Sequence, residues 1–309
     1  FKFNSSIILM LLSTRCLQRN AMRSSKTGQK TQAKSYCTVF SKSYETIKVE
    51  EKAEYKNVAW LTMNRPDVHN AFNQTLISEI KSVFDDIDTT KLRAVVITGE
   101  GKSFSAGADL NYMKSMATFK VKENQQDAGG LFDMFNSIRT CPLPVIARVN
   151  GAALGGGGGI VASADIAIAV EKAKFGFTEV KLGLLPATIS PFVMQKIGNT
   201  HASRYFLTGE RFDAKTAEDI GLLTKTSSDE DKLDEHVGEM LTHILENGPL
   251  AVQATKKLIA TVDAQEDISA DLTKFLVSNE IAKLRVSPEG QEGLSAFFEK
   301  RKPSWTNNE

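Results

Sequence analysis

The chain has 309 residues, of which 41% are apolar and 24% charged, and its formal net charge is +1. This length and apolar fraction fit one large domain with appendages, and the three cysteines exclude a small disulfide-stapled scaffold. No apolar run approaches the ~20 residues of a membrane-spanning helix, and no Cys/His spacing suggests a metal site.

The N-terminal region differs in composition from the rest of the chain. The first 44 residues contain no Asp or Glu, and residues 1–40 carry seven basic residues among many Ser and Thr. We expect residues 1–40 to be a mitochondrial transit peptide and the protein to act in the matrix. The short apolar run at 7–12 leaves a secretory signal as the alternative. Without those seven charges the net charge is −6, which does not fit a nucleic-acid binder.

Strand and helix patterns then alternate along the chain. Buried-strand patterns cover 58–63, 93–98, 144–149 and 165–170, and helical spacing covers 76–87, 121–138 and 155–163. This alternation predicts an α/β fold with a parallel sheet built by right-handed crossovers. Helical patterns dominate afterwards, at 191–197, 202–207, 214–220, 233–245, 251–262, 272–284 and 288–299. We expect an α/β core over 44–250 and a helical C-terminal region over 251–309.

Two glycine turns each follow a buried-strand pattern and lead into a helical one. The first is Phe-Ser-Ala-Gly-Ala-Asp-Leu at 104–110, and the second contains five consecutive glycines at 155–159. A glycine turn at a helix start lets a ligand approach the backbone and aims free N–H groups at it. Two such turns around one carbonyl oxygen would form an oxyanion hole. Close helix packing without catalysis is the alternative for the glycine run.

These turns and three further segments resemble the enoyl-CoA hydratase/isomerase (crotonase) family, in family order, from about residue 58 to 305. The other segments are Asn-Arg-Pro at 64–66 with Asn-Ala-Phe-Asn at 70–73, Thr-Glu-Val-Lys-Leu-Gly at 178–183, and residues 296–302. The resemblance implies a β-β-α superhelix whose C-terminal helices pack on trimer partners. It also implies an acyl-CoA substrate, a homotrimer or hexamer, and no cofactor, because coenzyme A is part of the substrate.

The resemblance assigns the catalytic groups by their positions in the motifs. The backbone amides of Ala108 and Gly156 are the expected oxyanion donors, and Glu179 is the expected acid/base. Apolar neighbours of Glu179 are expected to raise its pKa toward working pH. An ordinary glutamate at a helix start is the alternative reading. Family hydratases usually carry a second glutamate, at the position that Gly159 occupies here.

The family also suggests where coenzyme A binds. The backbone of Ala106 and Leu110 is expected to hold the adenine, and the loop that contains Val68 is expected to run beside the pantetheine. Phe297 and Lys300 match an aromatic residue and a lysine that can contact the nucleotide, sometimes across a subunit boundary. A solvated charge is the alternative for Lys300.

Three polar residues near the motifs are interpreted as structural. Asp109 follows a tight turn and suits a helix cap, with catalysis as the alternative. His69 is expected to contact backbone or solvent in its loop. Asp165 stands at a strand start and is expected to be a turn or capping residue.

One glutamate leaves two reactions open. Double-bond isomerisation needs only one carboxylate, so the mechanism alone favours a Δ3,Δ2-enoyl-CoA isomerase. The tract from Glu179 to residue 212 instead resembles bacterial-type methylglutaconyl-CoA hydratases of leucine degradation, which also have glycine at the first glutamate position. We therefore expect an enoyl-CoA hydratase acting on 3-methylglutaconyl-CoA. A catalytically weak acyl-CoA-binding or RNA-binding member is a further alternative. Arg148, Lys181 or Arg204 is expected to steer the substrate's second carboxylate.

Overall fold

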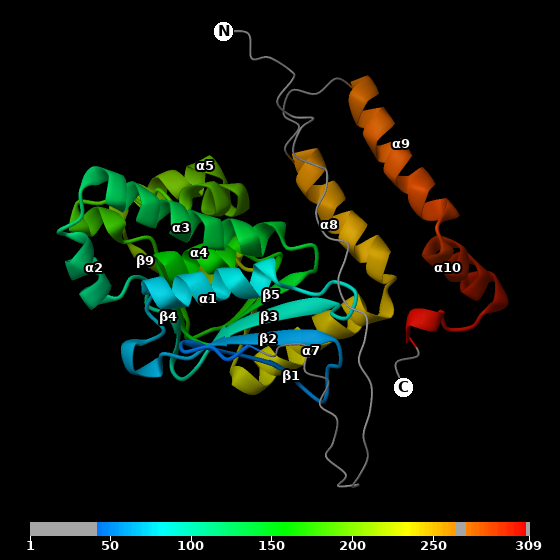
Figure 1. The fold of residues 1–309 in the computed structure, drawn as a ribbon, viewed down its shortest axis with the longest axis horizontal. Helices are drawn as coiled ribbons and strands as arrows, with labels where there is room; N and C mark the ends of the chain where they lie inside the picture. The colour runs from blue at the N-terminus through cyan, green and yellow to red at the C-terminus, as the bar shows by residue number, and fades with distance from the viewer. Residues whose placement is uncertain (1–41, 264–269, 307–309) are drawn as a thin grey trace, which may run out of the picture. The chain divides into compact units, whose positions relative to one another are not determined.

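The structure, a computed structural model, describes residues 42–263 and 270–306 (Figure 1). The expected transit peptide, residues 1–40, lies outside the described residues. The predicted α/β architecture is confirmed. The larger sheet has six strands in the order β1 (Ile47–Glu51), β2 (Val58–Met63), β3 (Ala94–Gly99), β5 (Val145–Val149), β7 (Ile166–Val170) and β10 (Lys225–Ser227). Its neighbours are parallel except β1, which is antiparallel to β2.

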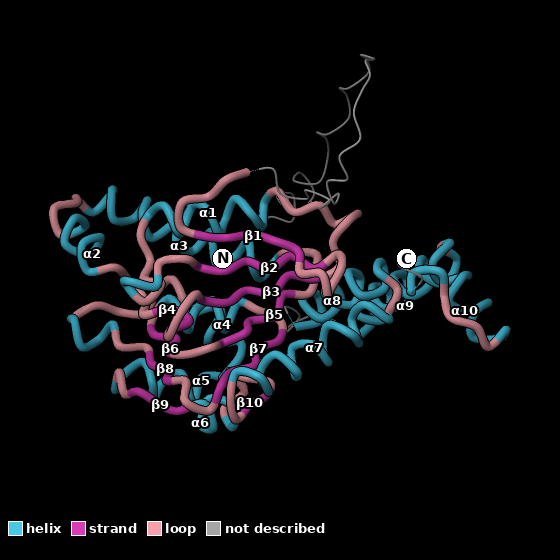
Figure 2. Tube along the Cα trace, turned by 90° about the horizontal axis from the view of Figure 1, so that it is seen from below, coloured by secondary structure: helices cyan, strands magenta, loops and turns pink. Residues whose placement is uncertain are grey.

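A second, smaller sheet was not predicted from the sequence, because its strands have only three residues each. It has the order β4 (Ser103–Ser105), β6 (Ala152–Leu154), β8 (Lys174–Gly176) and β9 (Arg211–Asp213). Figure 2 shows β4, β6, β8 and β9 beside the larger sheet. Since β4 follows β3 and β6 follows β5, this sheet carries the chain from the parallel strands directly into the two glycine turns.

The helices agree with the predicted helical patterns, with two differences. Their bounds are α1 (Gln74–Asp85), α2 (Leu110–Met116), α3 (Val121–Thr140), α4 (Gly156–Ser163), α5 (Ser190–Thr208), α6 (Ala214–Asp219), α7 (Glu230–Glu246), α8 (Pro249–Asp263), α9 (Ala270–Val286) and α10 (Pro288–Glu299), with 3₁₀ turns η1 (Pro66–Val68), η2 (Glu179–Leu182) and η3 (Ser304–Thr306). The patterns at 191–197 and 202–207 belong to α5, which is interrupted at Gly198 (φ 68°). The short helix α2 was not predicted.

The core lies between the larger sheet and the helices on its two faces. Every residue of β3 is buried, as expected for a central parallel strand covered on both sides. Helices α1, α3 and α4 cover one face, and α7 lies against the other (Figure 1). Asn73 caps α1 by accepting a hydrogen bond from the amide of Leu76, and the apolar stripe of α1 packs into this core.

The helical C-terminal region is also confirmed. No residue of α8 or α9 is buried. Several of the large apolar side chains on these two helices and α10 are exposed, among them Phe275, Phe297 and Phe298 at 63–77%. None of the described helices is long and apolar enough to cross a membrane.

Candidate active site

The two glycine turns meet because the strands before them pair. Strand β4 is parallel to β6, with Ser105 opposite Ala153. The turns then touch, since a Cβ added at Gly107 would lie 2.9 Å from the carbonyl oxygen of Leu154. The two glycine turns therefore lie in contact, as expected from the sequence.

Both expected oxyanion donors have free amides. The backbone of Phe72 bonds to the residues on either side of Ala108, donating to the Gly107 carbonyl (2.7 Å) and accepting from the Asp109 amide (2.9 Å). This pairing leaves the Ala108 N–H pointing away from the Phe72 strand. Gly156 is the first residue of α4, whose first turn has no intrahelical acceptor. Among the described residues neither amide donates to a protein acceptor, so both are available to a ligand oxygen.

Glu179 stands at the second turn. Its Oε1 is 3.1 Å from the point where a Cβ on Gly155 would lie, and Gly155 has a φ of 50°. Its Oε2 is buried without a hydrogen-bond partner. Burial raises the pKa of Glu179, against a smaller opposing effect of its own backbone N–H. A half-buried carboxyl with a raised pKa and a free oxygen is suited to accept and return a proton.

The position of the missing glutamate is filled by other side chains. A Cβ on Gly159 would lie 2.6 Å from Cγ2 of Ile189 and 2.9 Å from Cε1 of Phe135. Both of those residues are buried core residues. The structure thus leaves no room for a carboxylate at residue 159, which agrees with Glu179 being the single glutamate of this site.

A cavity of about 330 Å³ connects these groups. Its walls come from both turns, Phe72, α1, α2, α3, η2, the segment that follows η2, and β9. The lining residues are Phe72, Ile77, Ala106, Gly107, Ala108, Leu110, Tyr112, Met113, Met116, Asp127, Leu131, Leu154, Gly155, Gly156, Thr178, Glu179, Leu182, Leu184, Leu185, Pro186, Thr188, Ile189 and Arg211. We call it the site cavity. An apolar cleft with a few polar groups is the usual form of a small-molecule site.

Three polar residues of the site cavity were missed by the sequence analysis. Asp127 on α3 supplies a second carboxylate and accepts a hydrogen bond from the hydroxyl of Tyr112 on α2. Arg211 supplies a cation, and within the described residues it forms no ion pair. Asp127 and Leu131 are four residues apart on α3, so the helical pattern predicts that both side chains lie on the same face of the helix. No such signal marked Arg211, whose strand has three residues.

The structure brings together five of the eight predicted site residues. These are Ala106, Ala108, Leu110, Gly156 and Glu179, which all line the site cavity. The other three are exposed and do not line it: Val68 in η1, Phe297 on α10, and Lys300, which ends α10 with a φ of 55°. Their predicted contacts with coenzyme A stay predictions.

The three cations expected to steer a second carboxylate do not line the site cavity, and their role stays a prediction. Arg148 pairs with Asp234 (2.6 Å) and Arg204 pairs with Glu210 (2.7 Å), and neither lines the site cavity. Lys181 is exposed on η2 and does not line it either. Arg148 and Arg204 are thus bound to carboxylates outside the site cavity, whereas Lys181 is exposed beside it in sequence.

The structural interpretation of Asp109 is confirmed. Its carboxylate caps α2 by accepting from the amide of Asn111 (2.8 Å), and its other oxygen pairs with Arg65 (2.8 Å). Arg65 also donates to the carbonyl of Ala71. The pair therefore ties the first glycine turn to the loop before α1. His69 is exposed to solvent, as expected for this loop residue, and its Nδ1 also lies 3.1 Å from Oγ of Ser103.

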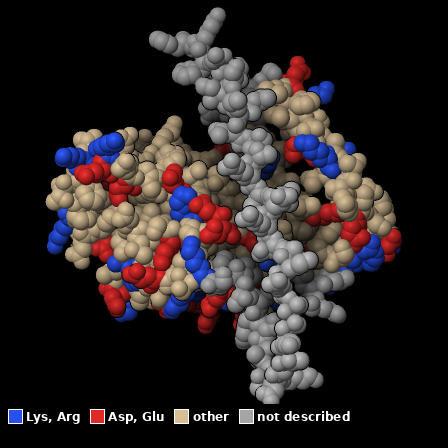
Figure 3. Space-filling view, in the orientation of Figure 1, with Lys and Arg blue, Asp and Glu red and all other residues tan. Residues whose placement is uncertain are grey.

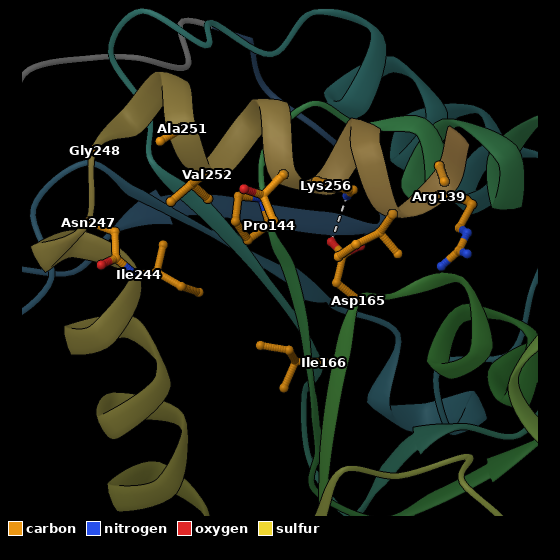
Figure 4. A pocket seen from close by; sticks show the side chains of 13 residues that line it. Arg139, Pro144, Asp165, Ile166, Ile244, Asn247, Gly248, Ala251, Val252 and Lys256 are labelled. Atoms are coloured by element: carbon orange, nitrogen blue, oxygen red, sulfur yellow. Dashed lines mark hydrogen bonds and ion pairs between the residues drawn. The ribbon is translucent and has the colours of Figure 1, made fainter. Parts of the chain in front are cut away.

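A separate cavity of about 530 Å³ lies beneath α8 (Figure 4). Figure 4 shows Lys256 reaching from α8 to Asp165, whose carboxylate it contacts at 2.6 Å. Lys256 also donates to the carbonyl of Leu143 (2.9 Å), and Asp165 accepts from the amide of Val145 (2.7 Å). Asp165 is thus a strand-start residue that also anchors α8. None of the predicted catalytic residues lines this cavity.

Comparison with known proteins identifies the family. Residues 53–308 match the model of the enoyl-CoA hydratase/isomerase family. A putative enoyl-CoA hydratase of Thermus thermophilus is 30% identical, over 82% of this chain and 98% of that protein. A mitochondrial Δ(3,5)-Δ(2,4)-dienoyl-CoA isomerase of Dictyostelium discoideum is 32% identical, over 84% of this chain and 90% of that protein.

The solved structures agree. A putative enoyl-CoA hydratase/isomerase (crotonase) of Legionella pneumophila is 43% identical, with a TM-score of 0.78, over 85% of this chain and all of that one. The chain belongs to the enoyl-CoA hydratase/isomerase family, and its fold is the crotonase fold. Within the described residues, no group of three or more His, Cys, Asp or Glu side chains is placed to hold a metal.

Proposed function

We propose that this protein is an enoyl-CoA hydratase, with 3-methylglutaconyl-CoA as its substrate. The observation that carries the proposal is the Glu179 carboxyl, whose Oε2 is buried without a partner, in the same cavity as the free amides of Ala108 and Gly156. The thioester oxygen gains negative charge during the reaction, and two preorganised N–H donors stabilise that charge. Loss of one donor in an oxyanion hole costs about 3–4 kcal/mol.

The proposed hydration uses Glu179 twice. Water forms a C–O bond at C3 while its proton passes to the Glu179 carboxylate, and the electrons of the C2–C3 π bond move to the thioester oxygen. Glu179 then returns the proton to C2, and the carbonyl re-forms. Hydrogen and hydroxyl are added across the double bond, and no cofactor is consumed. The raised pKa of Glu179 suits both transfers.

The Asp127 carboxylate supports hydration over isomerisation. Hydration needs a water molecule held in the cavity as well as a proton carrier. Asp127 lines the site cavity together with Glu179, and its carboxylate has acceptor capacity beyond the bond from Tyr112. Proton shuttling between two carbons needs no such group. The single glutamate, with Gly159 closed off by Phe135, still favours the isomerase as the second candidate.

The branched dicarboxylic substrate is proposed on two grounds. The tract from Glu179 to residue 212 resembles the bacterial-type methylglutaconyl-CoA hydratases, and Arg211 places a cation on the site cavity wall. A guanidinium with no carboxylate partner in the described chain is a suitable group to bind a substrate carboxylate. We extend the proposal to leucine degradation in the mitochondrial matrix, and to a homotrimer or hexamer joined through the exposed apolar side chains of α8–α10.

An RNA-binding role finds no support on the surface in view. Basic and acidic side chains are interspersed on the face shown in Figure 3, without a continuous basic stripe. Nucleic-acid binding depends on clustered Lys and Arg that neutralise phosphates.

The test uses the full chain with 3-methylglutaconyl-CoA, crotonyl-CoA and a 3-enoyl-CoA, with products followed by mass and absorbance. We expect water addition that is lost in Glu179→Gln and kept in Glu171→Gln, an exposed glutamate outside the site cavity. Double-bond migration without a gain of water would instead establish the isomerase. Inactivity on all three esters would refute both.

The substrate carboxylate is tested separately. Arg211→Met is expected to raise KM for 3-methylglutaconyl-CoA at least tenfold while leaving KM for crotonyl-CoA unchanged. Arg204→Met is the matched control, because Arg204 pairs with Glu210 and does not line the site cavity. Equal KM values for the dicarboxylic ester in wild type and Arg211→Met would rule out this role of Arg211.

A further inference from the structure

One side-chain contact joins α2 to α3 across the site cavity. The Tyr112 hydroxyl donates to the Asp127 carboxylate, and both side chains are half-buried. Burial, and next the bond to Asp127, raise the pKa of the Tyr112 phenol. The phenol therefore stays protonated at neutral pH and keeps its role as donor. Since α2 has no buried residue, its position depends on such side-chain ties.

This contact stands between two cavities. The site cavity has a volume of about 330 Å³, and a second one of about 430 Å³ lies between α1, α2 and α3. We call the second one the auxiliary cavity. Its lining residues are Gln74, Ile77, Ser78, Lys81, Tyr112, Phe119, Glu123, Gln126, Asp127 and Gly130. Three residues line both cavities, namely Ile77, Tyr112 and Asp127. These three side chains form the partition between the cavities.

The partition has one fixed and one adjustable part. Ile77 is buried in the core and belongs to the apolar stripe of α1. Tyr112 and Asp127 contact each other across the gap between two helices, and neither side chain is buried in the core. The auxiliary cavity offers apolar surface beyond it, from Ile77 and Phe119. Joining the two cavities would more than double the space next to the thioester site.

We propose that the Tyr112–Asp127 hydrogen bond closes the acyl end of the site cavity and limits the length of the acyl chain that the protein accepts. The inference rests on the proposed function, because it takes the site cavity to be the acyl-CoA site. With the bond in place, short or branched acyl groups fit within the site cavity. With the bond removed, a longer unbranched chain can enter the auxiliary cavity and bury its methylene groups there.

The experiment measures kcat/KM of the full chain on trans-2-enoyl-CoA esters with four, six and ten acyl carbons. The variants are Tyr112→Ala, which removes the ring and the bond, and Tyr112→Phe, which removes only the bond. Phe119→Ala is the matched control, because Phe119 lines the auxiliary cavity but not the site cavity. Binding of the same esters is measured by calorimetry in Glu179→Gln and in its combination with Tyr112→Ala.

Tyr112→Ala is expected to raise the ten-carbon to four-carbon ratio of kcat/KM at least tenfold, and Tyr112→Phe to raise it less. Phe119→Ala alone is expected to leave the ratio unchanged, since the partition still stands. An unchanged ratio in Tyr112→Ala, with four-carbon turnover retained, would overturn this inference and leave the proposed function intact. If Tyr112→Ala does not fold, the ratio in Tyr112→Phe decides in the same way. Absence of acyl-CoA binding by wild type would overturn both.

Discussion

Replacing Glu179 by Gln is expected to make the protein less active and more stable at the same time. The substitution keeps the size of the side chain and removes its charge and its proton transfer. Loss of one acid/base group typically lowers the rate about 10²- to 10⁴-fold, which corresponds to about 2.7–5.5 kcal/mol of transition-state stabilisation. The loss should fall on kcat, because binding of the thioester depends on other groups of the cavity.

The gain in stability follows from the buried Oε2 that has no partner. An unsatisfied buried polar atom costs about 1–3 kcal/mol and a charged one costs more, so removing the charge should stabilise the fold by on the order of 1 kcal/mol. For a chain of this size that is a rise in Tm of about 2–4 °C. Thermal unfolding followed by circular dichroism at pH 8 measures this rise.

The stability difference between wild type and Glu179→Gln is expected to depend on pH. Burial raises the pKa of Glu179 above its ordinary value of 4.5, so the folded state binds its proton more tightly than the unfolded state. The ionised carboxylate therefore destabilises the fold fully above the raised pKa and not at all below 4.5. The Tm advantage of Glu179→Gln should shrink as pH falls through this window. An advantage that stays constant with pH, or a variant less stable than wild type at pH 8, would refute the reasoning.

Three other substitutions test the surroundings of the site. Gly159→Glu should lower the free energy of unfolding by about 1–3 kcal/mol or more without raising activity, because Phe135 fills the space; increased hydration by this variant would contradict that packing. Gly155→Ala should lower kcat at least tenfold with thioester binding retained, since the φ of 50° strains alanine and its Cβ meets Glu179. A wild-type kcat in this variant would argue against the placement of Glu179 beside Gly155. Lys256→Met should lower the free energy of unfolding in urea by about 1–3 kcal/mol, because it leaves the Asp165 carboxylate without its ion-pair partner. An unchanged urea midpoint would contradict the anchoring role of Lys256.

The sequence predicted the elements whose signals are local. The parallel strands β2, β3, β5 and β7 are mostly apolar runs, and the helices around them show a 3.6-residue period, so both can be recognised within about ten residues. The two glycine turns could be placed because glycine is required where backbone approaches closely, as at Gly107. The smaller sheet, β1, β10 and α2 were missed because their patterns are too short or too polar to distinguish from loop.

What the sequence, with its family resemblance, indicated is the backbone chemistry of the site: two glycine turns with expected donors at Ala108 and Gly156, and one glutamate at 179. Only the tertiary structure decided which other side chains face them. Arg211, Tyr112 and Asp127 reach the site cavity from three separate elements, whereas the cations nearest the motifs do not. The reason is physical. A turn sets its own amides through local dihedral angles, but the meeting of distant side chains depends on how strands and helices pack, which no short stretch of sequence encodes.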